Sequence, residues 1–146
     1  MLTFLDIKKA VADKIKARFN YPIYLNDVTE GFSRPSFFIR ILPIMSEIAT
    51  ANTTHNKVTV EINYFQSKKE EKDNLQTMQA LKELFLQPLA VLDRKLICED
   101  LRVEVAEEEK QIYQFLFDLD YYDELPKTTE SYEPMGEILI NEEVEQ

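Results

Sequence analysis

Few residues of this chain have side chains suited to chemistry: one histidine, one cysteine and a close pair of aspartates. Asp118 and Asp120 are two apart on a predicted strand, so they share a face and could bind a cation or act as an acid pair. No histidine, glycine-rich loop or third carboxylate stands beside them in the sequence. We therefore interpret both aspartates as part of a solvated strand face.

His55 and Cys98 give no stronger indication of a reactive site. His55 lies in a segment rich in Thr and Asn, which we interpret as an exposed loop without an orienting acid nearby. Cys98 follows two apolar residues, which favours a buried small side chain over a nucleophile. Phosphate-binding, dinucleotide, nucleophile-elbow and zinc motifs are absent from the sequence. The sequence therefore predicts no enzyme, no metal and no cofactor.

The element that must organise the chain is a strand preceded by a turn. Gly31, one of two glycines, suits a strained turn position, and Pro35 then favours extended geometry before it. Residues 37–44 are apolar on both faces, and Arg40 is their only charge. We expect this strand inside a sheet that is covered on both sides, at least in part, with Arg40 paired to a carboxylate.

The next strand is predicted to form a hairpin with the first. Residues 45–56 are small and polar, which indicates a long tip that is mobile or ordered by a partner. Residues 58–64 then alternate, so one face is apolar and the other meets water or a partner. Tip and strand supply our candidate subunit or tube interface, which consists of Arg34, Arg40, Glu47, Asn52, Thr53, His55 and Lys57.

Two amphipathic helices should cover the sheet. Thr3 can cap the first helix, and Asp73 can start a second one that buries Leu75 and ends before Pro88. A second hairpin is predicted over residues 101–121. These elements predict a single α/β domain of the α+β kind, with a mixed or antiparallel sheet of four to five strands and two main helices packed on it.

Charge divides the chain into a domain at residues 1–122 and an acidic C-terminal tail at 123–146. Eight acidic residues and one lysine give the tail a charge of -7, out of -10 for the whole chain. Basic residues are too dispersed for binding to nucleic acid, and no apolar run is long enough to span a membrane. Residues 135–140 form an apolar island in the tail, which suggests docking on the chain's own domain or on a neighbouring subunit. We expect the tail to lie against a basic surface such as the first helix.

The order of elements, together with Glu-Gly-Phe-Ser-Arg-Pro-Ser-Phe-Phe-Ile at 30–39 and Val-Glu-Ile-Asn-Tyr-Phe-Gln at 60–66, resembles a known family. It is similar to phage tail terminator proteins of Gram-positive phages and phage-derived contractile particles, over residues 4–121. The matching positions are chiefly structural: Gly31, Pro35, Phe37, Phe38, Tyr64 and Phe65.

The resemblance implies a hexameric ring at the head-proximal end of the tail tube. Such a ring stops tube growth and then offers a surface to the neck or head connector. The implied partners are further copies of the chain, the tail tube protein, the sheath protein where the tail has one, and the connector. The implied location is the virion tail, assembled in the bacterial host cytoplasm.

Two other functions remain open at this point. A head-to-tail joining protein of the neck would share the size, the acidity and the lack of catalytic motifs. A monomeric acidic inhibitor that mimics nucleic acid would share the charge, although here the charge is concentrated in the tail. The sequence also leaves open whether the tail contracts and whether the source is a virus or a bacteriocin-like particle.

Overall fold

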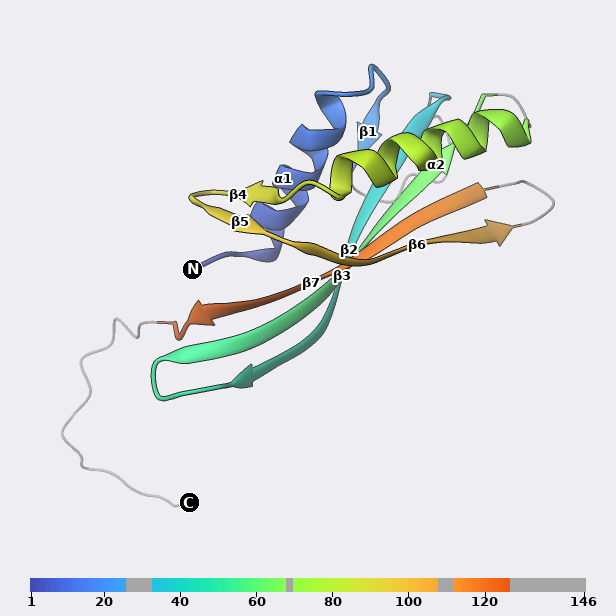
Figure 1. Cartoon of the computed structure of the whole chain (residues 1–146). Coiled ribbons are helices and arrows are strands. Elements are labelled where there is room, and N and C mark those ends of the chain that lie inside the picture. The colour runs from blue at the N-terminus through green and yellow to red at the C-terminus, as the bar shows by residue number, and fades with distance from the viewer. Residues whose placement is uncertain (26–32, 68–69, 108–111, 127–146) are drawn as a thin grey trace.

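Two helices lie on one face of a twisted β-sheet (Figure 1). The computed structural model describes residues 1–25, 33–67, 70–107 and 112–126. In chain order its elements are α1 (Phe4–Lys16), β1 (Ile23–Tyr24), β2 (Ser36–Ile48), β3 (Thr53–Phe65), α2 (Glu71–Phe85), β4 (Leu89–Val91), β5 (Arg94–Leu96), β6 (Cys98–Glu107) and β7 (Ile112–Glu124).

The main sheet has five strands in the order β1-β2-β3-β7-β6. The short strand β1 runs parallel to β2, and the other neighbours are antiparallel. Strands β4 and β5 form a separate two-stranded hairpin beside α1 (Figure 1). This mixed five-stranded sheet with two helices confirms the predicted α+β fold.

Helix α1 begins where the sequence predicts. The Thr3 hydroxyl accepts a hydrogen bond from the Asp6 amide, and the Asp6 carboxylate accepts one from the Thr3 amide, which completes a capping box. Ile7, Val11 and Ile15 then recur at helical spacing and are fully buried. The buried stripe fixes which side of α1 faces the sheet.

Helix α2 differs from the prediction at its first turn. It begins at Glu71, and Asp73 lies inside it, where its carboxylate accepts a hydrogen bond from the Tyr64 hydroxyl at 2.7 Å. Burial of Tyr64 is the larger cause, and this hydrogen bond the smaller one, of a phenol pKa that is raised above its usual range. The expectation that Leu75 is buried is wrong, because its side chain is 53% exposed.

One apolar core lies between the helices and one face of the sheet. Phe37 and Ile39 of β2, alternate residues of β3 and β7, and the inner sides of both helices all belong to it. The predicted cover on both sides of β2 holds only for its first residues, 36–39, which are buried on both faces. In the described part of the chain the other sheet face carries no helix or strand (Figure 1). Phe38 is packed there between the rings of Tyr24 and Phe65, and Leu116 of β7 is also buried.

The predicted long tip of the first hairpin is also wrong. Strand β2 continues to Ile48 and β3 begins at Thr53, so a short turn joins two long strands. A register shift between Pro43 and Met45 moves Met45 and Glu47 onto the face that Arg40 occupies. β-Branched residues at 48, 53 and 54 suit this extension, although the segment is polar.

The last strand overlaps the predicted acidic tail. Asp123 and Glu124 belong to β7, and Glu124 pairs with Thr53 of β3. Residues 127–146, including the apolar island at 135–140, lie outside the described residues, and so does Gly31. Within the described ranges, neither helix is long and apolar enough to cross a membrane.

The core predicts a large cost for removing its central ring. Phe117 is fully buried and stacks on Phe85 at 4.7 Å between centroids, so Phe117→Ala should lower the free energy of unfolding by ~3–5 kcal/mol. Urea denaturation followed by circular dichroism measures this change. The exposed control Leu5→Ala on α1 should change stability by only about 0.5 kcal/mol. Equal losses for both variants would contradict the described core.

Candidate functional site

The uncovered face of the sheet, which we call the open face, is mostly polar. Alternation along the strands places it opposite the core, and it runs across β2, β3, β7 and β6. Its members are Phe38, Arg40, Leu42, Met45, Glu47, His55, Lys57, Thr59, Glu61, Asn63, Phe65, Glu99, Arg102, Glu104, Gln114, Leu116, Asp118, Asp120 and Tyr122.

A buried carboxylate holds the β2 side of the open face together. Glu61 is only 6% exposed, because it lies on the central strand between neighbouring side chains. One of its oxygens pairs with Arg40 Nη2 at 3.1 Å, and the other accepts a hydrogen bond from Asn63 Nδ2 at 3.0 Å. Gln114 Nε2 then donates to Asn63 Oδ1 at 2.7 Å. The carboxylate that Arg40 was expected to pair with is therefore Glu61 of the same domain.

A second buried carboxylate lies on β7. Asp118 is 7% exposed and accepts hydrogen bonds from Thr59 Oγ1 at 2.7 Å and from Arg102 Nη2 at 3.4 Å. The interpretation of Asp118 as part of a solvated face is therefore wrong: neighbouring strands enclose and satisfy it. No group of three or more potential metal ligands occurs within the described ranges. The carboxylate contributes to cross-strand pairing.

His55 lies in a strand, which corrects the predicted loop histidine. Its Nε2 contacts the Asp120 carboxylate, and its Nδ1 is 3.6 Å from Glu47 Oε1. Its ring stacks on Tyr122, with 4.7 Å between centroids. The acids come from β2 and β7, so the histidine joins three strands. The sequence analysis did not find these acids because they lie on other strands than His55.

Around His55 and toward the turn, the three strands form an arm. It consists of residues 45–57 of the first hairpin and residues 120–124 of β7. The side chain of Ile48 near its end is 73% exposed. Asn52 lies in the turn and Thr53 begins β3, where the Thr53 amide donates to Thr50 Oγ1 and the Leu125 amide donates to Asn52 O. The arm is therefore an ordered extension of the sheet.

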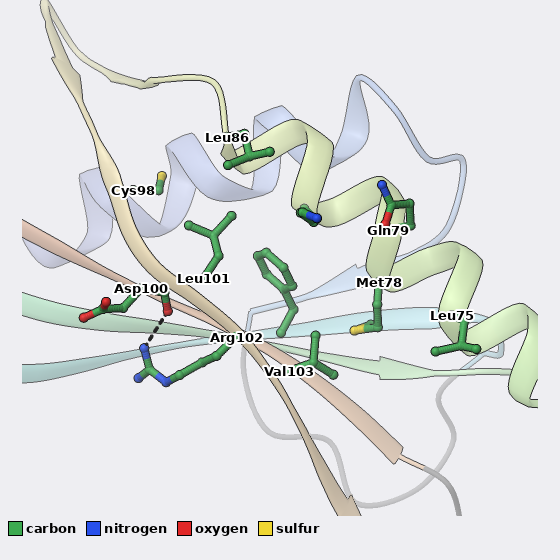
Figure 2. A pocket seen from close by; sticks show the side chains of 11 residues that line it. Leu75, Met78, Gln79, Leu86, Cys98, Asp100, Leu101, Arg102 and Val103 are labelled. Atoms are coloured by element: carbon green, nitrogen blue, oxygen red, sulfur yellow. Dashed lines mark hydrogen bonds between the residues drawn. The ribbon is translucent and has the colours of Figure 1, made fainter.

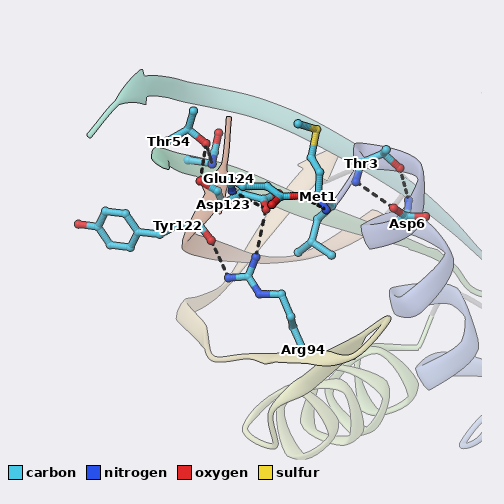
Figure 3. A network of polar contacts seen from close by, with 10 residues as sticks. Met1, Thr3, Asp6, Thr54, Arg94, Tyr122, Asp123 and Glu124 are labelled. Atoms are coloured by element: carbon cyan, nitrogen blue, oxygen red, sulfur yellow. Dashed lines mark hydrogen bonds and ion pairs between the residues drawn. The ribbon is translucent and has the colours of Figure 1, made fainter. Parts of the chain in front are cut away.

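Polar contacts fix the outer part of the arm, around Thr54 and Asp123, to the domain (Figure 3). The Asp123 carboxylate accepts a hydrogen bond from the Leu2 amide at 2.7 Å and lies 3.7 Å from Arg94 Nη1. Arg94 Nη2 also donates to Tyr122 O at 2.7 Å, and Thr54 Oγ1 donates to Asp123 O. These contacts connect β7 with the segment before α1 and with β5, so the arm has a defined direction relative to the helices.

The motif residues surround the start of the same hairpin. Phe37 pairs with Tyr64 in the core, while Phe38 and Phe65 meet edge to face on the opposite side, with centroids 4.7 Å apart. The Arg34 guanidinium lies over the Phe65 ring and donates to Gln66 O. The aromatic residues thus have packing environments rather than reactive ones.

The structure places the candidate interface residues in three groups. Arg40, Glu47, His55 and Lys57 share the open face, whereas Asn52 lies in the turn at the end of the arm and Thr53 begins β3. Arg34 lies at the opposite end of the hairpin. In the first two groups Arg40, Glu47 and Asn52 are exposed, and the others are half-buried.

A comparison with known families identifies the family of the chain. A family model described as phage tail terminator protein matches residues 6–131. The chain belongs to the phage tail terminator family. This result confirms the predicted resemblance and extends it past the end of β7. No curated protein matches the sequence.

Family membership gives this terminator chain a structural role in the phage tail, with other tail components as partners. Its family is structural rather than enzymatic, which agrees with the absence of catalytic motifs in the sequence. The open face and the arm are therefore the surfaces whose part in assembly should be tested. The carboxylates on them have hydrogen-bond partners and need no catalytic explanation.

Cys98 offers a chemical test of the described packing. Burial raises the pKa of the thiol to about 11, and the nearby Lys14 opposes this shift. Alkylation by iodoacetamide at pH 8 should therefore be about 100-fold slower in the folded than in the unfolded chain. Because the unfolded thiol ionises first, stability should fall as pH rises from about 9 to 11. Cys98 is half-buried, and equal alkylation rates would contradict this partial burial.

The Arg40–Glu61 pair predicts a coupling that a double-mutant cycle can measure. Arg40→Met leaves Glu61 buried without its cation and should cost ~1–3 kcal/mol of stability. In the Glu61→Gln background the same change should cost much less, because no charge is left unpaired. Additive effects in chemical denaturation would show that the two side chains do not interact.

Proposed function

We propose that the chain forms a hexameric ring that caps the head-proximal end of the tail tube. The ring stops polymerisation of the tube protein and then offers the attachment surface for the neck or head connector. The observation that carries this proposal is the family match over residues 6–131, which includes every described element except the first residues of α1.

The shape of the subunit supports capping. A tube rim offers the same surface at each subunit, and a protein that matches the rim without reproducing it ends the polymer. A heterologous interface that closes on itself gives a ring of fixed size. The central carboxylates of the open face, Glu61 and Asp118, are already satisfied, so a neighbour can cover these two without leaving them unpaired.

The arm is the part of the subunit that we assign to the contact with the tube or with the adjacent subunit. It extends the sheet beyond the two helices (Figure 1), and the exposed side chains of Glu47 and Ile48 lie along it. Because the arm is paired on three strands, little conformational entropy is lost when a partner covers it. This ordered arm replaces the long tip, mobile or ordered by a partner, that the sequence predicts.

Tube assembly with purified components tests the capping function. Adding the chain to polymerising tail tube protein should shorten the tubes and place a ring at one end in electron micrographs. Mass measurement in solution should give six copies in the capping species. A monomer at all concentrations would favour the nucleic-acid mimic. A protein that binds the connector without changing tube length would favour a head-to-tail joining role.

Charge reversal on the arm should weaken capping. Glu47→Lys places a like charge beside His55 and Lys57 on the exposed part of the open face, and we expect about tenfold more protein for half-maximal capping, equivalent to ~1.4 kcal/mol. The matched control Glu83→Lys, on the exposed side of α2, should cap normally. Normal capping by Glu47→Lys and by an Ile48→Glu variant would exclude the arm from the contact.

A further inference from the structure

An apolar groove lies between α2 and β6, away from the open face (Figure 2). Its volume is about 560 Å³. Helix α2 and its C-cap contribute Leu75, Met78 and Leu86, and the sheet contributes Leu101, Val103 and Phe115. Figure 2 shows Met78 and Leu86 above the strand that carries Leu101 and Val103.

The groove is an unusual feature for a chain with a well-packed core. Leu75 is 53% exposed and Val103 is 45% exposed, although both lie at positions that periodicity assigns to the interior. β6 is also an edge strand in the described sheet, with backbone donors and acceptors facing away from β7. An added strand would cover both the apolar side chains and this edge.

The sequence of the chain after β7 contains a segment suited to this place. Met135, Ile138, Leu139 and Ile140 form an apolar island, and the two isoleucines favour strand geometry. Acidic residues stand on either side of the island at 133, 142 and 143, and within it at 137. Lys82 lines the groove and can pair with one of these carboxylates, whereas Asp100 also lines it and Arg102 pairs with Asp118.

The length of chain is sufficient for this segment to reach the groove of its own subunit. Val103 pairs with Phe115, which is nine residues before Glu124, so the groove lies about 30 Å back along β7. The fourteen residues from 127 to 140 can span at most about 46 Å when extended. The remaining length allows the chain to pass around β5 before it enters the groove at the Cys98 end.

We propose that residues 135–140 bind in the α2–β6 groove of their own chain and pair with the edge of β6. Because the segment enters at the Cys98 end, it runs parallel to β6, and its isoleucines cover Leu75 and Val103. The C-terminal segment thereby closes the sheet edge of each subunit. This assignment does not depend on the ring or on capping. It also differs from the sequence-based expectation that the acidic tail lies against the basic surface of α1.

Hydrogen–deuterium exchange on the full-length protein tests the proposal. Backbone amides of residues 137–140 should exchange at least about tenfold more slowly than in a synthetic peptide of residues 132–146. Val103→Glu and Leu75→Glu should each abolish this protection, whereas the control Leu5→Glu, on an exposed face of α1, should retain it. Peptide-like exchange, or protection that survives both groove variants, would overturn the proposal.

Cross-linking separates the chain's own segment from that of a neighbouring copy. In a Cys98→Ser background, Val103→Cys with Ile140→Cys should give a disulfide within one chain on mild oxidation, seen as faster migration in a denaturing gel. The pair Leu5→Cys with Ile140→Cys should give none. A cross-link that joins two chains would overturn the assignment to the same subunit, whether or not the protein caps tubes.

Discussion

The structure depends on the two different faces of strand β3. One face carries Val58, Val60, Ile62 and Tyr64, which form the centre of the core with α1 and α2. The other face carries Thr59, Glu61 and Asn63, which have no helix above them in the described part of the chain. Since β3 is flanked on both sides by long strands, its polar groups must be satisfied by side chains of β2 and β7. The Glu61 and Asp118 networks follow from this constraint.

The same constraint explains why the hairpin continues past the helices as an ordered arm. Each added residue pair in β2, β3 and β7 satisfies backbone groups without needing a core. His55, Asp120 and Tyr122 hold the three strands together, and the contacts of Asp123 with Leu2 and Arg94 fix the outer part of the arm to the domain. A surface that is ordered before assembly binds with a smaller entropic cost than a mobile loop. The arm can therefore hold one geometry for a rim of repeated subunits.

Local patterns were sufficient to predict much of the fold. The Thr3 cap, the α1 stripe and the alternation in β3 and β7 depend on neighbours within a few residues, and all three are confirmed. The length of the arm was missed because its polar composition conceals strand pairing, and the register shift after Pro43 cannot be read from alternation. The partners of His55 and Asp118 depend on register between strands about 60 residues apart, which a single sequence does not specify.

A reconstruction by electron microscopy of the head-proximal end of assembled tails would test the central claim most directly. The account predicts a closed ring of this chain at that end, with the arm and the open face covered by tube or neighbouring subunits. The helices α1 and α2 should remain on the opposite side of the sheet from that contact. A ring whose arms and open faces all point into solvent, or tail ends that lack the chain, would contradict the account.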